Sequence, residues 1–251
     1  MPIRLFRSRP SRVPTVPPGQ RIYAIGDVHG RSDLHDRLMA MVRDDRAAAP
    51  PGTAATVVLL GDLVDRGPDS AGMLERLAAG PPPGFGLVAL RCNHEDTMER
   101  FLDDPGAVPE WFRFGGLATL ESYGVRLDPR LPGPARVTAA HAALRAAIPH
   151  RHLAVLRGMR SHLSVGDYLL VHAGVRPGVL LDAQDPADLM WIREDFLDSG
   201  ADHGKVVVHG HTIVRAPEVR RNRIGIDTGA FATGRLTALV LEGEDRRFLS
   251  T

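Results

Sequence analysis

The sequence predicts an α/β fold, in part α+β, in which two packed mixed β-sheets are flanked by helices. Three consecutive units of strand, polar loop and helix fill the first 95 residues, and such units build a parallel sheet with right-handed crossovers. Beyond residue 160 the apolar runs are short, and a hairpin turn separates two of them. Strands that run first in parallel and later antiparallel indicate two sheets packed face to face.

The first unit begins with a strand at residues 21–25, which leads into the loop Gly26-Asp27-Val28-His29-Gly30. Apolar side chains then recur at helical spacing from residue 34 to residue 42, so a helix follows. Ser32 or Asp33 is the expected cap of this helix, because short polar side chains accept hydrogen bonds from its first free amides.

The second unit carries the loop around which we expect the site to be organised. Residues 56–60 are Thr-Val-Val-Leu-Leu, a nearly continuous apolar run that is typical of a strand buried on both faces. The loop Gly61-Asp62-Leu63-Val64-Asp65-Arg66-Gly67 follows, and the next helix is expected to start near Asp69. Because open α/β folds bind ligands at the carboxyl ends of their strands, two carboxylates and an arginine lie where a ligand would bind.

The third unit places a strand at residues 86–90 before Arg91-Cys92-Asn93-His94-Glu95 and another helix. Later strands end at His172-Ala173-Gly174 and at His209-Gly210-His211. If these ends meet the three earlier loops, then five strand ends deliver metal-capable side chains to one place.

The remaining segments suggest the domain organisation. Residues 1–20 hold four arginines and five prolines, and we expect a flexible basic arm there. Residues 21–251 are expected to form a single domain. Within it, residues 104–160 are helical and irregular, and we expect them to be an insertion that covers one side of the site.

Composition excludes several classes of function. The net charge is +1, so there is no general electrostatic attraction to nucleic acid. No window approaches the ~18 apolar residues of a membrane span, and the first residues lack the apolar core of a signal peptide. A single cysteine, Cys92, allows no intrachain disulfide, so we expect a reducing, cytoplasmic location. The sequence predicts no particular oligomeric state.

The polar strand ends suit a pair of metal ions. Nitrogen and oxygen donors without a thiolate favour manganese, iron or zinc over calcium or magnesium. Six ligands are too many for one open site, so we expect two divalent ions, with manganese as the first expectation and iron or zinc as alternatives. Asp62 is the candidate shared ligand, and the ions would hold a bridging hydroxide for in-line attack on phosphorus. The expected ligands are Asp27, His29, Asp62, Asn93, His172 and His211.

Phosphoryl transfer also needs cations and a proton donor. Arg66 lies on the central loop and Arg193 on a separate segment, and each planar guanidinium can grip two phosphate oxygens. His94 directly follows the expected ligand Asn93, so we expect it to protonate the leaving group. Asp65 would orient this histidine and keep it protonated.

The three loops in this order resemble the phosphoprotein phosphatase branch of the calcineurin-like metallophosphoesterases. Residues 21–242 carry the resemblance, which continues in Trp191-Ile192-Arg193-Glu194 and Ile226-Asp227-Thr228-Gly229. It is closest to the compact bacterial and phage phosphatases and to the symmetrical diadenosine tetraphosphate hydrolases. The resemblance implies a four-layer sandwich. It also implies a first metal on Asp27, His29 and Asp62, and a second on Asp62, Asn93, His172 and His211.

The function that we expect is a metal-dependent protein phosphatase. Its substrate would be a phosphorylated protein or peptide, at phosphoserine or phosphothreonine, with phosphotyrosine as a further substrate. The first alternative is a diadenosine polyphosphate hydrolase, which would need an aromatic-lined groove for two bases. The second is a metal-bound scaffold that recognises phosphorylated partners without turnover. The candidate aromatic residues for the base groove are Tyr23, Tyr123, Tyr168 and Phe231.

Two positions are ambiguous in the sequence. Cys92 stands where the family usually has glycine, and it is either a small buried residue or a thiol whose oxidation inhibits the enzyme. His209 lies two residues before His211, and the Gly-His-Thr context favours His211 as the ligand and His209 as a structural residue.

Overall fold

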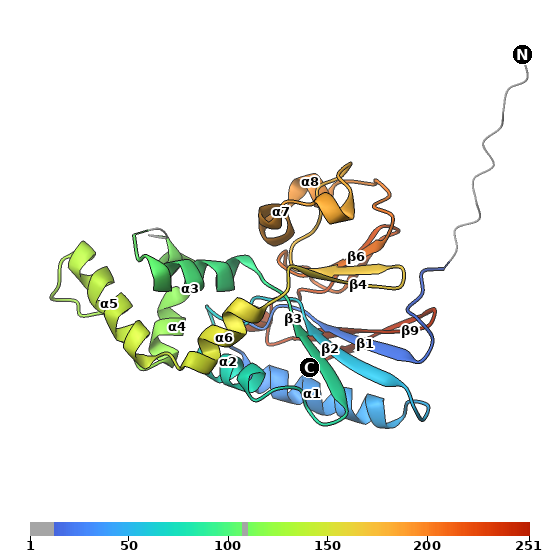
Figure 1. Cartoon of the computed structure of the whole chain (residues 1–251), viewed down its shortest axis with the longest axis horizontal. Coiled ribbons are helices and arrows are strands. Elements are labelled where there is room, and N and C mark those ends of the chain that lie inside the picture. Colours follow the sequence, from blue (N-terminus) through green and yellow to red (C-terminus); the bar gives the residue numbers. More distant parts are fainter. Residues whose placement is uncertain (1–12, 107–109) are drawn as a thin grey trace, which may run out of the picture.

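The computed structural model describes residues 13–106 and 110–251 and confirms the predicted fold class. Two five-stranded mixed sheets pack against each other, with helices on their outer sides (Figure 1). The strand order of the first sheet is β10-β9-β1-β2-β3, and that of the second is β4-β5-β6-β8-β7.

The first sheet aligns the three predicted loops. Its strands are β1 (Gln20–Ile25), β2 (Ala54–Leu59), β3 (Phe85–Ala89), β9 (Thr237–Glu242) and β10 (Asp245–Ser250). β1, β2 and β3 run in parallel, and their last residues Ile25, Leu59 and Ala89 lie opposite one another. The loops that follow therefore leave the same edge of the sheet.

The second sheet brings the two later strand ends to that edge. Its strands are β4 (His162–Val165), β5 (Tyr168–Val171), β6 (Val206–His209), β7 (Glu218–Val219) and β8 (Arg223–Gly225). β4 and β5 form the predicted hairpin, whereas β5, β6 and β8 run in parallel. His172 follows β5, and His211 lies two residues beyond β6.

Apolar strands hold the layers together because both of their faces are covered. One face of β1 and β2 packs against the second sheet, and the other packs against α1 (Ser32–Ala47). Figure 1 shows α2 (Ser70–Ala78) beside α1, and α7 (Pro186–Trp191) and α8 (Glu194–Leu197) above the second sheet. The core between the sheets includes Ile22, Ala24, Val58, Leu60, Leu170, Val208, Ile224 and Leu239.

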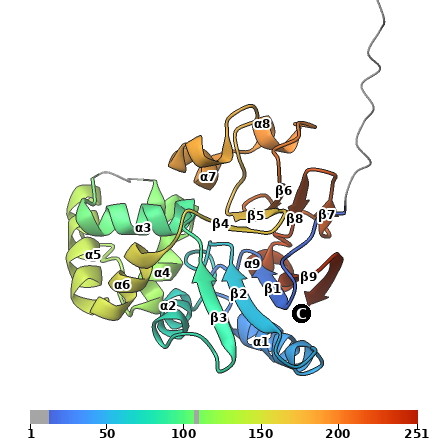
Figure 2. The same cartoon turned by 45° about the vertical axis from the view of Figure 1, so that its right-hand side comes forward.

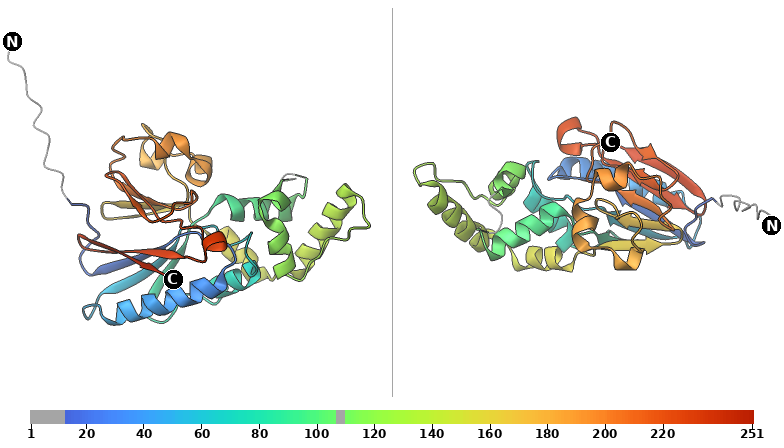
Figure 3. Two further views of the ribbon diagram at one scale, coloured as in Figure 1. Left: turned by 180° about the vertical axis from the view of Figure 1, so that it is seen from behind. Right: turned by 90° about the horizontal axis from the view of Figure 1, so that it is seen from above.

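The segment expected to be an insertion is helical and lies beside the sheets (Figures 2 and 3). It contains a short 3-10 helix (Trp111–Phe114), α4 (Gly116–Ser122), α5 (Gly133–Ala147) and α6 (His150–Gly158). With α3 (Asn93–Asp103) these helices share a core of their own, centred on Phe101, Trp111 and Leu144.

The structure corrects two details of the sequence prediction. Part of the expected arm packs on the domain, since Val16 is buried and its amide donates to the Gly243 carbonyl at 3.0 Å. Residues 1–12 of that arm lie outside the described residues. The predicted cap of α1 is also wrong, because no side chain caps this helix and the Ser32 hydroxyl donates instead to Asp69. Asp69 caps α2, whose predicted start is confirmed.

Among the described residues, no helix combines the length and the apolar composition that crossing a membrane requires.

Candidate dimetal centre

The loops at the shared sheet edge adopt a backbone conformation that is rare for residues with side chains. Within the described residues, the positive-φ positions other than glycine are His29, Asp62, Asp65, Arg66 and His211. Such conformations cost of order 1–3 kcal/mol each, and they persist where the surrounding structure enforces them. All five are predicted site residues, so this strain is concentrated where the loops turn their side chains inward.

Asp62 lies at the centre of the cluster. Its Oδ2 is 3.1 Å from His29 Nε2, and its Oδ1 is 3.4 Å from His172 Nε2. Burial alone would raise the pKa of this carboxyl, but the imidazoles of His172, His94 and His29 hold it well below its usual value. The two oxygens of one ionised carboxylate thus face two different histidines, as a shared ligand requires.

One half of the cluster contains Asp27 and His29. The His29 Nδ1 donates to the Val64 carbonyl at 2.9 Å, so Nε2 carries the lone pair that faces Asp62. The Asp27 Oδ2 accepts the His211 amide at 2.9 Å. Burial, followed by the charges of Asp227 and Asp62, raises the pKa of Asp27 well above its usual value. A cation between these carboxylates would relieve that repulsion.

The other half contains Asn93, His172 and His211. His172 Nε2 lies 2.9 Å from Asn93 Oδ1 and 3.1 Å from His211 Nδ1, while His172 Nδ1 donates to the Leu60 carbonyl at 2.9 Å. Burial lowers the pKa of His172 to about 4, and burial together with His172 lowers that of His211 to about 2. Both imidazoles are therefore neutral at pH 7, which is the form that binds metals.

These residues fit a pair of divalent cations. Asp27 Oδ1, Asp62 Oδ1 and His211 Nε2 are buried and have no hydrogen-bond partner among the described residues. Leaving carboxylate oxygens buried and unpaired is costly, whereas coordination of a cation satisfies them. Asp62 also belongs to both of the histidine-containing donor groups whose atoms lie within 4.8 Å of one another, one with His29 and one with His172.

The expected proton donor is held on the substrate side of the cluster. His94 Nδ1 lies 2.6 Å from Asp65 Oδ2, and both side chains are buried. Burial lowers the pKa of His94, but the charges of Asp62 and Asp65 outweigh it and the net shift is upward. Asp65 itself accepts Trp111 Nε1 at 3.0 Å and the Thr119 hydroxyl at 2.6 Å.

Trp111 and Thr119 are functional positions that the sequence analysis missed. Both come from the helical segment, so that segment supplies the contacts that fix Asp65. The signal in the sequence was the Gly115-Gly116 pair. Gly115 has φ +114°, and a Cβ there would lie 2.7 Å from the Arg66 amide nitrogen, so the pair marks a close approach to the central loop.

Two exposed arginines border the cluster, one on the loop after β2 and one between α7 and α8. Arg66 Nη1 lies 3.0 Å from His29 Nε2, and its Nη2 lies 3.1 Å from His94 Nε2. Arg193 Nη1 donates to the Thr212 hydroxyl at 3.2 Å and, at 3.3 Å, to the His211 carbonyl. The structure therefore brings all ten predicted site residues to one place; their roles stay predictions.

Of the four aromatic residues considered for a base-binding groove, only Phe231 contacts the cluster. Its ring lies 4.9 Å from Arg66 Cζ and 5.2 Å from the His29 ring. The other three are engaged elsewhere: the Tyr23 hydroxyl donates to Asp45, that of Tyr168 donates to the Pro14 carbonyl, and that of Tyr123 bonds His152. Trp191 was not considered for this groove, yet it is 45% exposed and its ring lies 6.5 Å from that of His211.

Cys92 has the properties of a buried packing residue. Its φ of −128° and ψ of 177° are ordinary extended values, so this position does not need glycine. The sulfur accepts the amides of Asp62 and His94 at 3.1 and 3.2 Å, and the thiol donates to Glu95. Burial, followed by Asp62 and Glu95, raises the pKa of the thiol well above its usual value, which disfavours the reactive thiolate.

Glu95 is a third position whose role the sequence did not reveal. Its carboxylate accepts the amides of Asp62, Leu63 and Val64 at 3.1, 2.8 and 3.0 Å. The first residues of α3 therefore hold the central loop in place.

His209 points away from the cluster. It is fully buried, its ring packs 5.1 Å from that of Phe196, and its Nδ1 bonds the Gly210 carbonyl at 3.1 Å. Its surroundings agree with the structural role expected for it.

Two packed sheets, with a buried carboxylate–imidazole cluster and two exposed arginines at one edge, define a metal-dependent phosphoesterase. Residues 20–215 match the sequence model of the family described as Calcineurin-like phosphoesterase, and the chain belongs to that family. It is a metal-binding hydrolase that acts on phosphoester bonds, and it has candidate ligand clusters for the dinuclear divalent metal site that this family uses.

Relatives divide between two kinds of substrate. The chain is 30% identical over 230 residues to serine/threonine-protein phosphatase 1 of Salmonella typhimurium, an alignment that covers 87% of this chain and 90% of the relative. It is 28% identical over 273 residues to the symmetrical bis(5'-nucleosyl)-tetraphosphatase of Nitrosospira multiformis, covering 92% and 95%. A solved structure provisionally assigned as a diadenosine tetraphosphatase shares the fold, with a TM-score of 0.63, 20% identity and coverage of 95% and 98%.

Proposed function

We propose that this protein is a dimetal-dependent phosphomonoesterase that removes phosphate from phosphoserine or phosphothreonine in proteins, with phosphotyrosine as a further substrate. The observation that carries the proposal is the convergence of Arg66, Arg193 and the Asp65–His94 pair on the buried cluster. Two cationic forks and one proton donor are what the transfer of a single phosphoryl group requires.

The chain's own side chains would divide the work as follows. When bound, the two ions, manganese by our proposal, would polarise the phosphoryl group and activate the attacking water. Asp62 would bind both ions, because its two oxygens face different histidines. The remaining ligands would be Asp27 and His29 for one ion, and Asn93, His172 and His211 for the other.

Arg66 has a second task besides binding. In the structure its guanidinium hydrogen-bonds His29 Nε2 and His94 Nε2. A phosphoryl group would take over these N–H donors and leave His94 Nε2 free to face the leaving oxygen. Nε2 accepts from Arg66 in this structure, and the upward pKa shift caused by Asp62 and Asp65 favours its protonation once Arg66 has moved to the phosphoryl group, so that His94 can then protonate this oxygen.

The small number of arginines beside the cluster favours a single phosphoryl group over a polyphosphate as the bound group. Arg66 and Arg193 are the two arginines that hydrogen-bond predicted metal ligands within the described part of the chain. Arg31, on the first loop, is committed to Asp33 at 2.8 and 2.7 Å. A dinucleotide tetraphosphate would need further cations for its additional phosphates.

The second candidate is hydrolysis of a diadenosine polyphosphate. Phe231 and Trp191 offer ring faces at the border of the cluster, and nucleobases stack on such faces. The similarity to the tetraphosphatase from Nitrosospira multiformis, which aligns over most of this chain, also supports this candidate.

One assay separates the candidates. We would compare kcat/KM for phosphoserine, phosphothreonine and phosphotyrosine peptides with kcat/KM for diadenosine tetraphosphate, using protein loaded with manganese, zinc, iron or magnesium. We expect the phosphopeptides to dominate. A dominant rate on the dinucleotide would overturn the first proposal in favour of the second. A metal-loaded protein that turns over none of them would favour a phosphopeptide-binding scaffold.

A further inference from the structure

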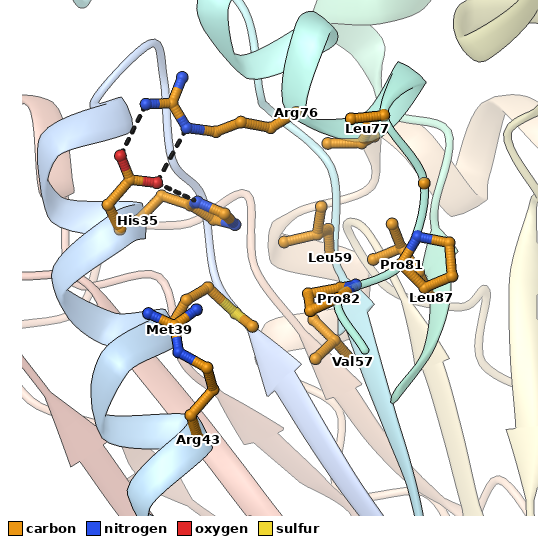
Figure 4. Close-up of a pocket in the computed structure, with 13 residues that line it drawn as sticks. His35, Met39, Arg43, Val57, Leu59, Arg76, Leu77, Pro81, Pro82 and Leu87 are labelled. Atoms are coloured by element: carbon orange, nitrogen blue, oxygen red, sulfur yellow. Dashed lines mark hydrogen bonds and ion pairs between the residues drawn. The ribbon is translucent and has the colours of Figure 1, made fainter. Parts of the chain in front are cut away.

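A cavity of about 350 Å³ lies between α1 and α2 on the outer face of the first sheet (Figure 4). None of the residues that line it is a predicted site residue. Its volume is within the range of small-molecule binding sites. Its apolar side is formed by Met39, Val57, Leu59, Leu77, Pro82 and Leu87.

The sequence explains why the helices leave this space. α2 ends at Ala78 and is followed by Gly80-Pro81-Pro82-Pro83. Proline lacks the amide that a further turn needs, so α2 stops before it covers the β2–β3 part of the sheet. The proline-containing loop forms the opposite wall from α1, as Figure 4 shows for Pro81 and Pro82.

The polar side of the cavity carries an uncompensated positive charge. Arg76 donates to both oxygens of Asp36, at 2.8 and 2.6 Å, and His35 Nδ1 lies 3.4 Å from the same carboxylate. Arg43 is exposed and has no hydrogen bond or ion pair with any described residue. Burial lowers the pKa of His35, so this ring is neutral. Asp36 is the one carboxylate among the residues that line the cavity, and it is paired with Arg76, so the charge of Arg43 is unmatched there.

We propose that this cavity binds a small organic anion, whose apolar body lies on the six side chains of the apolar side and whose single acidic group pairs with Arg43. The charge of Arg43 favours an anionic ligand, because a neutral ligand would leave this guanidinium unpaired and a cation would be repelled. The apolar side of the cavity favours a ligand whose remaining part is uncharged, since a second charge buried there would have no partner.

An occupant would act on the phosphoesterase site through α2. Arg76 Nη1 lies 3.6 Å from Asp69, the residue that caps α2. The next residue, Ser70, accepts the Asp65 amide at 3.0 Å, and Asp65 holds His94 at 2.6 Å. A ligand that parts α1 from α2 therefore displaces the residue that fixes the proton donor.

The test uses anilinonaphthalene sulfonate, a probe with an aromatic body and one acidic group, titrated into the full chain with excess inorganic phosphate to fill the arginines of the phosphoesterase site. We expect saturable binding at one site per chain. Arg43→Gln should weaken it about tenfold, the size of one lost charge-assisted contact. Arg37→Gln is the matched control, because Arg37 is exposed on the same helix but does not line the cavity. Leu87→Trp should block binding by filling the space.

Binding that is equal in wild type, Arg43→Gln and Leu87→Trp, with all three showing the same cooperative unfolding, would overturn the site. Turnover of p-nitrophenyl phosphate, assayed without added phosphate, gives the second readout. We expect saturating probe to change kcat at least about twofold in wild type and in Arg37→Gln, and Arg43→Gln to need about tenfold more probe for the same change. Site-specific binding without any change in kcat would overturn the coupling through α2. The binding readout does not depend on the identity of the physiological substrate.

Discussion

Replacing Asp65 by asparagine tests the proton-donor assignment most directly. The substitution keeps the size of the side chain and removes the charge that lies 2.6 Å from His94 Nδ1. Both groups are buried, and a hydrogen bond to a charged group is worth about 1.5–3 kcal/mol. If His94 loses its hydrogen bond to a charged Asp65 in the transition state, kcat should fall about 10- to 100-fold. Because Asp65 raises the pKa of His94, the alkaline limb of the pH profile should also move to lower pH.

The loss should depend on the leaving group. A serine alkoxide is a poor leaving group that needs the proton, whereas p-nitrophenolate leaves readily without it. We therefore expect Asp65→Asn to impair a phosphoserine peptide severely and p-nitrophenyl phosphate mildly, with metal content unchanged by elemental analysis. Thr119→Val is the milder matched variant, since it removes one neutral donor to the same carboxylate. Equal losses on both substrates would refute the assignment of the Asp65–His94 pair.

Four further predictions follow from the contacts described above. Asp62→Asn should bind less than one metal ion per chain, and full metal content by elemental analysis would contradict its role as the shared ligand. Phe231→Leu removes the ring next to the Arg66 guanidinium, so the inhibition constant for inorganic phosphate should rise about two- to fivefold; an unchanged constant would disprove the contact's importance. Cys92 should react with a thiol reagent only after unfolding, and Cys92→Ala should match wild type in sensitivity to peroxide; rapid labelling of the native protein would show that the thiol is accessible. Burial lowers the pKa of His209 to about 4, so the unfolded chain binds a proton that the folded protein does not between about pH 6.5 and pH 4. The free energy of unfolding should therefore fall by up to about 3 kcal/mol as the pH decreases through that window, and His209→Gln should lack this component in urea titrations.

Much of the site could be predicted because its parts are local in sequence. Each expected ligand lies within the few residues that follow an apolar strand, and parallel strands place their carboxyl ends at one edge. Asp62, Asp65 and Arg66 also lie on a single loop, whose spacing fixes which residues can reach the same ligand. The turn between β4 and β5 could also be predicted from local sequence. Its Gly166 tolerates the φ of +53° that the turn requires.

Contacts between distant segments could not be predicted in this way. The prediction for Ser32 was wrong because its hydroxyl finds Asp69, a partner 37 residues away, in place of the first amides of its own helix. Residues 13–19 looked like part of an arm, yet Val16 is buried against a turn near the other end of the chain. The conformational preferences of neighbouring residues predict neither contact, because both join segments that are far apart in the sequence and meet only in the packed structure.

The amino-acid sequence by itself determined the fold class, the strand ends and the identity of the polar side chains that they carry, since hydrophobic periodicity and loop composition act over a few residues. Tertiary structure alone decided the state of those side chains. Burial among neighbouring charges sets which imidazoles are neutral and which carboxylate is ionised. It also placed Trp111 and Thr119 on Asp65, and it left the cavity beside Arg43, because such contacts depend on how separate layers meet.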